Sequence, residues 1–178
     1  MPTRLLLGIT ALTIGALCLA GLATAETGNS KTGSTHKTAA TNQQSSFSAS
    51  DRTFIKNAAK GGEMEVAMGK VAAQHATNAA VKSFGQRMVT DHSKANDELK
   101  SIAQKKGVTL PSQKPSEKWT SDKVYINMMV KDHEKDLAEF QKEARETKDP
   151  DLKQFAEQTA KLVQEHLNLA EETQGKLR

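Results

Sequence analysis

The sequence contains MVTDHSK at residues 88–94 and repeats it as MVKDHEK at residues 129–135. Both copies lie in long segments whose apolar residues recur at alternating spacings of three and four, which is the pattern of an amphipathic helix. In each copy the histidine, His92 or His133, occupies a stripe position where leucine would be the usual core residue. The repeat therefore predicts two helices that each turn a histidine toward the core.

Two further segments show the same spacing and also carry one polar residue on the apolar stripe. These residues are Glu65 in the segment before the first copy and His166 in the last segment of the chain. Short turns join the first helix to the second and the third to the fourth, so these pairs should be antiparallel neighbours. The sequence therefore predicts an all-α fold, an antiparallel up-down-up-down four-helix bundle, with helices at about 51–76, 78–106, 121–147 and 150–174.

Four polar groups are expected to meet inside this bundle. At a rise of about 1.5 Å per residue, Glu65, His92, His133 and His166 all lie within about one turn of the middle of their helices. Buried together without partners, three imidazoles and a carboxylate would cost several kcal/mol. A bound cation would remove that cost, so these four residues are the predicted metal ligands.

The donor set of three nitrogens and one oxygen suits a divalent transition metal. Four-coordinate Zn²⁺ fits it best, and Fe, Mn, Ni or Cu would also accept such ligands. Met88 and Met129, each four residues before a histidine, are candidate soft ligands for Cu(I), although methionine is also an ordinary core filler. The alternative is a metal-free network in which histidine and glutamate bond one another and fix the register of the helices.

An acid precedes each predicted histidine ligand. The acids are Asp91, Asp132 and Glu165, and each is displaced by about 100° around its helix from the histidine that follows. They could hold the ring nitrogen that faces away from the metal, or capture an incoming cation. Asp136 and Asn96 are weaker candidates for the same supporting role.

The first 25 residues have the features of a signal peptide. Arg4 precedes an apolar run at residues 5–19, and Ala23-Thr24-Ala25 predicts cleavage after Ala25. Residues 26–50 are rich in Ser, Thr, Gly, Asn and Gln, and are expected to form a disordered polar linker before the bundle at 51–176. The protein is therefore expected in the periplasm or outside the cell, with an uncleaved inner-membrane anchor as the alternative.

The composition of the chain argues against several other classes of function. The net charge is +4, and positive and negative residues are interspersed along the helices, which argues against nucleic acid as a partner. Cys18 is the single cysteine and lies in the leader, so metal ligands must be His, carboxylate or Met. No nucleophile with an adjacent base is evident, so an enzyme is the third hypothesis, after the two binding or structural ones, and catalysis would require an open metal position and a pocket. Besides a metal ion, a protein of the cell envelope is the partner class that remains.

Residues 51–174 resemble a family of exported bacterial proteins of unknown function with a ferritin-like domain, whose members are often automatically named membrane or outer membrane proteins. The resemblance implies a ferritin-like four-helix bundle and brings no established activity. It rests on separated motifs in order: Asp51 to Phe54, Gly61-Gly62 followed by Glu65, Phe84 to His92, Tyr125 to His133, and Phe155 to His166.

One departure from ferritin-like di-iron proteins matters. Their sites use Glu-x-x-His pairs, whereas the residues three before the predicted histidine ligands are Val89, Val130 and Val163. Too few carboxylates remain to bridge two irons. The expected function is therefore binding of one metal ion, for metal buffering, stress protection or structural stability, and the alternative is a metal-free structural or interaction module of the cell envelope.

Overall fold

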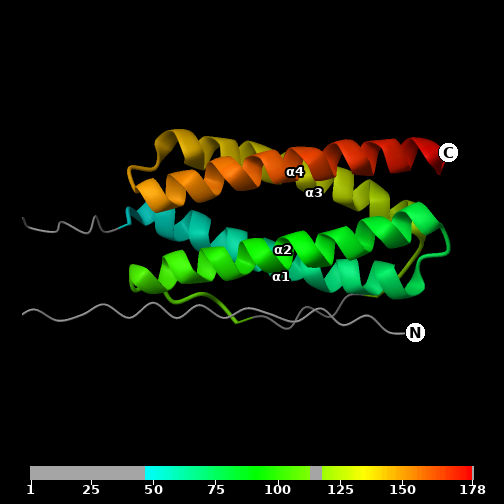
Figure 1. Cartoon of the computed structure of the whole chain (residues 1–178), viewed down its shortest axis with the longest axis horizontal. Coiled ribbons are helices and arrows are strands. Elements are labelled where there is room, and N and C mark those ends of the chain that lie inside the picture. The colour runs from blue at the N-terminus through cyan, green and yellow to red at the C-terminus, as the bar shows by residue number, and fades with distance from the viewer. Residues whose placement is uncertain (1–46, 113–117, 178) are drawn as a thin grey trace, which may run out of the picture. The chain divides into compact units, whose positions relative to one another are not determined.

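The computed structural model of the chain describes residues 47–112 and 118–177, and these contain four α-helices and no strand. The expected all-α class is confirmed for this part of the chain. The predicted signal peptide and most of the predicted linker lie outside the described residues. Figure 1 shows the four helices side by side: α1 (Ala49–His75), α2 (Ala79–Lys105), α3 (Asp122–Glu146) and α4 (Pro150–Lys176).

Each helix begins at a residue whose side chain accepts hydrogen bonds from the first turn. Asn78, Ser121 and Asp149 fill this position in α2, α3 and α4, and Pro150 follows Asp149 at the first position of α4, where proline is tolerated. At the other end of α2, Gly107 adopts a φ of 68°, which favours glycine. Local capping chemistry therefore sets these helix boundaries.

The first helix begins earlier than its sequence pattern suggested. Ser48 is the N-cap, and it forms a capping box with Asp51, so the ordered chain extends into the last residues of the predicted linker. Phe47 is 4% exposed and belongs to the apolar core. Burial of this aromatic ring explains the difference, because it supplies the apolar area that the rest of the linker lacks.

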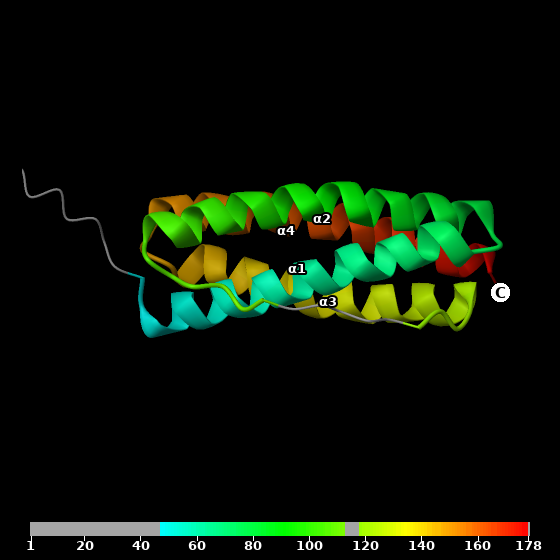
Figure 2. The same ribbon diagram turned by 90° about the horizontal axis from the view of Figure 1, so that it is seen from below.

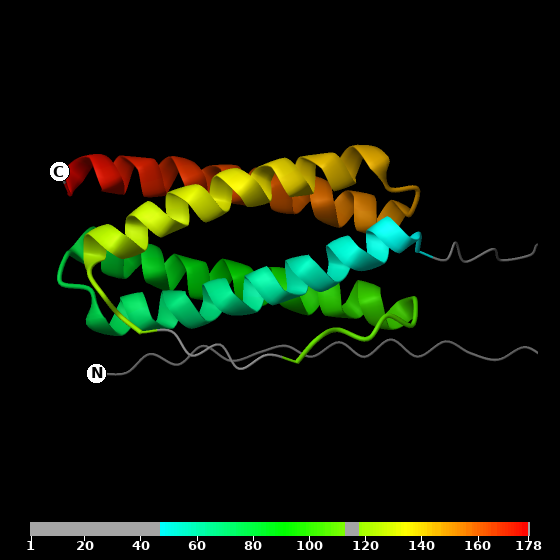
Figure 3. The same ribbon diagram turned by 180° about the vertical axis from the view of Figure 1, so that it is seen from behind.

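The directions of the helices differ from the expected order. Asp122, at the start of α3, accepts hydrogen bonds from the backbone N–H groups of Thr77 and Asn78, just before α2. The helices α2 and α3 therefore begin at the same end and run parallel, and the up-down-up-down prediction is wrong. Figure 2 shows the described parts of their connection at opposite ends of the domain, and Figure 3 shows α1 beginning where α3 finishes.

The long connection is the physical reason for this order. The chain between α2 and α3 can span about 50 Å, whereas a helix of this length spans about 40 Å, so the connection can return along the domain. The helices that pack together are α1 with α2, α3 with α4, α2 with α4 and α1 with α3. Every one of these pairs is antiparallel.

Two apolar clusters fill the interior, one toward each end, and each draws residues from all four helices. The cluster at the end where α1 and α4 begin, called the first cluster, contains Phe47, Ile55, Leu99, Ile102, Phe140, Leu152, Phe155 and Val163. The second lies where α2 and α3 begin and contains Val81, Phe84, Met88, Tyr125, Ile126, Met129 and Leu167. Although these clusters make the helices apolar on one side, no helix among the described residues has the length and apolar character needed to cross a membrane.

Glycines bring α1 and α2 into close contact beside the second cluster. A Cβ atom on Gly69 would lie 2.7 Å from the carbonyl oxygen of Gly85, and a Cβ on Gly85 would lie 2.8 Å from the Cβ of Ala72. Gly61, by contrast, has no atom of the described residues, outside its own turn of helix, within 4 Å of the position that a Cβ would take. The close approach therefore depends on Gly69 and Gly85.

Two buried carboxyl groups meet near the start of α1. Asp51 and Glu143 are 6% and 7% exposed, and their side chains share a hydrogen bond. Burial, together with the hydrogen bond and the charge of Asp51, raises the pKa of Glu143 to about 7. The proton on Glu143 therefore stabilises the fold below its ordinary pKa, and this contribution is lost as the pH rises through about 7.

We expect Glu143→Gln to raise the Tm by about 3–5 °C at pH 8 and to change it little at pH 5. The amide can still donate a hydrogen bond to Asp51 but cannot ionise, so the cost of a second buried carboxylate disappears. Thermal unfolding followed by circular dichroism at both pH values measures the effect. Glu134→Gln, at an exposed position farther away on the same helix, is the control, and an equal shift at both pH values would contradict the explanation.

Candidate metal centre

The four predicted ligands lie between the two apolar clusters, one on each helix. Glu65 of α1 and His92 of α2 are 6% and 4% exposed, and His133 of α3 and His166 of α4 are 0% exposed. One ring nitrogen from each histidine belongs to a group of three whose members all lie within 4.8 Å of one another. The structure therefore brings the three histidines together as the spacing on the stripes predicts.

The three rings form a nearly regular triangle. The ring centroids of His92 and His133 are 5.7 Å apart, those of His92 and His166 are 5.1 Å apart, and those of His133 and His166 are 5.5 Å apart. Among residues 47–112 and 118–177, one nitrogen of each ring finds no hydrogen-bond partner: Nε2 of His92, Nε2 of His133 and Nδ1 of His166. Such buried polar atoms without partners are unfavourable unless something binds them.

The other ring nitrogens are held by acceptors. Nδ1 of His133 lies 2.9 Å from the carbonyl oxygen of Met129, and Nε2 of His166 lies 2.9 Å from a carboxylate oxygen of Asp91. Because neither acceptor carries a hydrogen, each of these nitrogens must donate. The opposite nitrogen of each neutral ring then has a lone pair available for a metal.

The two carboxylate oxygens of Glu65 have different surroundings. Its Oε2 lies 2.8 Å from Nδ1 of His92, while its Oε1 lies 3.6 Å from Nε2 of His133 and has no hydrogen-bond partner. The group of three nitrogens does not include an oxygen of Glu65. This glutamate therefore orients His92 through one oxygen and leaves the other beside the triangle.

The charges at the centre are coupled. Burial alone would raise the pKa of Glu65, but the charge and the hydrogen bond of His92, with the other two histidines, hold that pKa below its ordinary value. Burial would likewise lower the pKa of His92, but Glu65 holds it above the ordinary value. Both shifts favour a carboxylate on Glu65 and a protonated ring on His92, and a metal bound at Nε2 of His92 would take the place of a proton there.

The other two histidines are neutral at pH 7. Burial lowers the pKa of His133, and the charge of His92 acts in the same direction. Burial lowers the pKa of His166 to about 4, even though Asp91 favours the protonated ring. Neutral imidazoles are the form that binds metal ions.

The acids predicted to support the histidines lie in different places. The helices α1 and α2 form one helical hairpin, and α3 and α4 form the other. Asp91 of α2 accepts a hydrogen bond from His166 of the other hairpin and not from the neighbouring His92. The same carboxylate lies 3.1 Å from Nε of Arg87. Glu165 is exposed and pairs with the same arginine at 2.8 Å. Sequence reasoning missed Arg87, because an exposed arginine on a helix carries no signal of the acid that it will position.

The two candidate soft ligands belong to the apolar core. Met88 and Met129 are 0% and 1% exposed and pack in the second apolar cluster. Met129 also contributes its backbone oxygen, which accepts the hydrogen bond from His133. Its connection with the site is therefore through the main chain.

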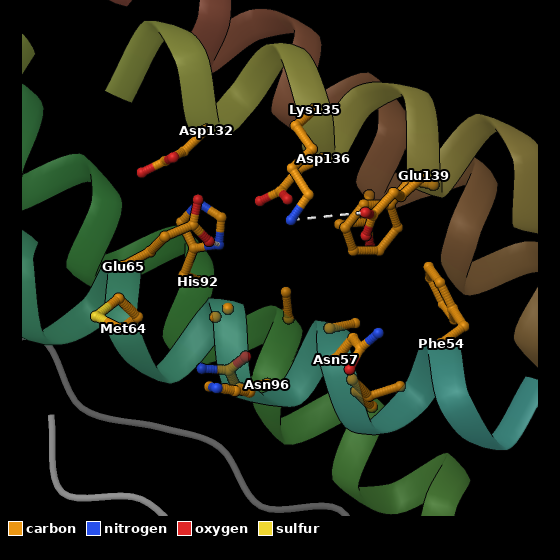
Figure 4. A pocket seen from close by; sticks show the side chains of 18 of the residues that line it. Phe54, Asn57, Met64, Glu65, His92, Asn96, Asp132, Lys135, Asp136 and Glu139 are labelled. Carbon is orange, nitrogen blue, oxygen red and sulfur yellow. Dashed lines mark ion pairs between the residues drawn. The ribbon is translucent and has the colours of Figure 1, made fainter. Parts of the chain in front are cut away.

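A cavity of about 410 Å³ opens beside the centre. Glu65 and His92 form part of its wall, and Figure 4 shows Asp132 and Asp136 of α3 across from them. Asn96 also lines this cavity. Burial, followed by the charge of Glu65, raises the pKa of Asp136 to about 7. Three residues predicted to support the ligands thus line an opening next to the site.

Two solved structures of bacterial proteins have a fold similar to that of this chain. A protein of Bacillus halodurans provisionally assigned to the spore coat aligns with a TM-score of 0.67 and 11% identity, over 75% of this chain and 91% of its own. A fragment of the domain of unknown function DUF305 from Deinococcus radiodurans aligns with a TM-score of 0.63 and 10% identity, over 74% and 99%. At these identities the likeness shows a shared helical fold.

A search among the curated proteins finds none similar to this chain. The model of one protein family matches residues 36–173, which include α1, α2, α3, all of α4 except its last three residues, and the three clustered histidines. The chain therefore belongs to the family described as a domain of unknown function, DUF4142.

Proposed function

We propose that this domain binds one transition-metal ion through His92, His133 and His166, with Glu65 as the fourth ligand. Two observations on the same three buried histidines carry the proposal. Each ring offers one nitrogen within 4.8 Å of the others, and each ring has one nitrogen without a hydrogen-bond partner among the described residues. A network built only to fix the helix register would be expected to satisfy these atoms internally. A cation bound between the three rings would give these nitrogens the partner that the described residues do not supply.

The proposed ion is Zn²⁺ first, with Fe, Mn, Ni or Cu as the other metals that accept this donor set. With Zn–N bonds of about 2.1 Å, tetrahedral coordination separates the nitrogens by about 3.4 Å. The nitrogens of the triangle lie within 4.8 Å, so side-chain shifts of about 1 Å would suffice. The partnerless Oε1 of Glu65 is next to Nε2 of His133 and supports the role of fourth ligand.

We further propose that the four helices form a bundle of the ferritin-like type. Four-helix proteins of this type have one long connection and antiparallel neighbours, as the course of the chain between α2 and α3 suggests. The di-iron chemistry of ferritin-like proteins does not follow, because valines stand where their Glu-x-x-His pairs need a carboxylate. A single ion held mainly by histidines is the form that these residues support.

Export is part of the proposal and rests on the sequence of residues 1–25. An exported domain with one buried metal would serve metal buffering, stress protection or its own structural stability. The competing function is a metal-free structural or interaction module. The hydrogen bonds from His92 to Glu65 and from His166 to Asp91, which form without metal, favour that alternative.

Metal content is the direct test. We expect the mature chain, purified without a polyhistidine tag, to hold about one metal ion per chain after reconstitution and desalting. His92→Ala with His133→Ala should hold almost none. His75→Ala is the matched control, because His75 is exposed near the end of α1. Absence of metal from the wild type after reconstitution with Zn, Fe, Mn, Ni and Cu would overturn the proposal.

A further inference from the structure

The cavity beside the centre separates α1 from α3, which pack together less closely than the two helical hairpins do internally. Small residues on α1 and α2 leave this space open, since Ala58, Gly61, Gly62 and Ala95 all line it. The larger apolar side chains of the first cluster close one side of the cavity. The cavity is therefore a consequence of small residues placed opposite short carboxylates.

Acidic side chains predominate in the wall. Glu65, Asp132, Asp136 and Glu139 line the cavity, against two lysines, of which Lys135 pairs with Glu139 at 3.7 Å. A concave surface with this charge concentrates cations by focusing the field. Figure 4 shows Asp132 and Asp136 on the side of the cavity opposite Glu65.

Two of the residues that line the cavity, Glu65 and His92, carry a buried atom without a hydrogen-bond partner among the described residues. Glu65 is 94% buried, since only 6% of it is exposed, and its Oε1 has no hydrogen-bond partner. His92, 4% exposed and with a partnerless Nε2, lines the cavity as well, whereas His133 and His166 do not. Of the four proposed ligands, these two are therefore the ones that an ion in the cavity would meet first.

We propose that this cavity is the route by which a hydrated divalent metal ion reaches and leaves the centre, with Asp132 and Asp136 binding it transiently on the way. The inference rests on the proposed metal-binding function and adds to it that the site exchanges its ion. The two aspartates act as positioning residues: they attract the ion and pass it to Glu65, and the histidines then replace its remaining water. Because they bind on the route and not at the end point, they should change rates more than affinity.

The test compares rates and equilibrium in the same protein. Metal-free mature chain is mixed with Zn²⁺ in a stopped-flow instrument, and release is followed with a chromophoric chelator in excess. Asp132→Asn with Asp136→Asn should slow both loading and release by about tenfold and keep the Kd within about threefold of wild type. The effect on loading should shrink at high ionic strength, because salt screens the attraction.

The matched control removes two carboxylates elsewhere. Measured at pH 8, above the pKa of Asp136, Asp97→Asn with Glu157→Gln changes the net charge by about the same amount at exposed positions that are not among the residues lining this cavity. This variant should load at the wild-type rate. Equal slowing by the control would show a general effect of net charge and would overturn the proposed route.

A second variant obstructs the cavity without changing charge. Gly61 lines it and has nothing within 4 Å of its Cβ position, so Gly61→Leu should fold and fill part of the space. We expect slower loading and slower release with the Kd nearly unchanged. Gly61→Ala, which adds one methyl group, should exchange metal at almost the wild-type rate.

The outcomes separate the two proposals. A wild type that binds no metal refutes the proposed function and, with it, this route. A wild type that binds metal, while the aspartate and leucine variants load and release it at wild-type rates, refutes the route alone. If the aspartate variant released the ion faster and its Kd rose in proportion, Asp132 and Asp136 would be ligands of the bound ion. That result would also overturn their role on the route.

Discussion

Replacing His133 by leucine is expected to abolish the stabilisation that metal gives this domain, and to leave the metal-free protein at least as stable as the wild type. His133 is 0% exposed and its Nε2 has no hydrogen-bond partner, so an apolar side chain of similar volume removes an unfavourable buried atom. The carbonyl of Met129 keeps its hydrogen bond within the helix. Only the bound ion depends on the imidazole.

The size of the effect follows from mass action. At a free metal concentration a thousandfold above the Kd, one site stabilises the fold by about 4 kcal/mol, or roughly 10–20 °C in Tm for a domain of this length. Differential scanning fluorimetry with and without Zn²⁺ measures the shift in wild type, His133→Leu and the exposed control His75→Gln. A Tm loss of equal size with and without metal would favour the metal-free network.

Gly85→Ala is expected to destabilise the domain by about 2 kcal/mol, although alanine is the better helix former. The added Cβ would lie 2.8 Å from the carbonyl oxygen of Gly69 and from the Cβ of Ala72, so α1 and α2 must move apart. Overpacking of this kind typically costs 1–3 kcal/mol. Since Glu65 and His92 lie on the same two helices, the variant should also bind metal more weakly.

Gly61→Ala is the matched control for this prediction. It makes the same substitution inside a helix, but at a position with nothing within 4 Å of the new Cβ. The propensity of alanine should therefore stabilise the fold by up to about 1 kcal/mol. Urea unfolding of both variants gives the two free energies of unfolding. If Gly85→Ala also raised the free energy of unfolding, the close contact of α1 with α2 at Gly85 would not be a steric constraint on stability.

The sequence is informative about the helices and the histidines for physical reasons. Asn78, Ser121 and Asp149 cap helices through local hydrogen bonds, which depend only on nearby residues. The convergence of His92, His133 and His166 follows from stripe position and height, which hold whichever way each helix runs. This explains why the cluster of three histidines could be predicted from a topology that is wrong.

Other features depend on contacts that no local pattern encodes. A long connection is compatible with either direction of α3, so the sequence does not show whether α2 and α3 run parallel. The hydrogen bonds of Asp122 with the residues before α2 show that they do. The partner of Asp91 is a histidine 75 residues away. Gly61 and Gly69 are alike in sequence, and only the position of α2 distinguishes the open one from the crowded one.

The origin of the four proposed ligands has a mechanical consequence. Glu65 and His92 come from the hairpin of α1 and α2, and His133 and His166 come from the hairpin of α3 and α4. With a single cysteine in the sequence, no disulfide within the chain can join these halves. A bound ion would be a reversible cross-link closing a loop of about 40 residues between His92 and His133, a constraint comparable to a disulfide worth about 4 kcal/mol. The supply of metal would then determine how firmly the two halves of the domain are held together.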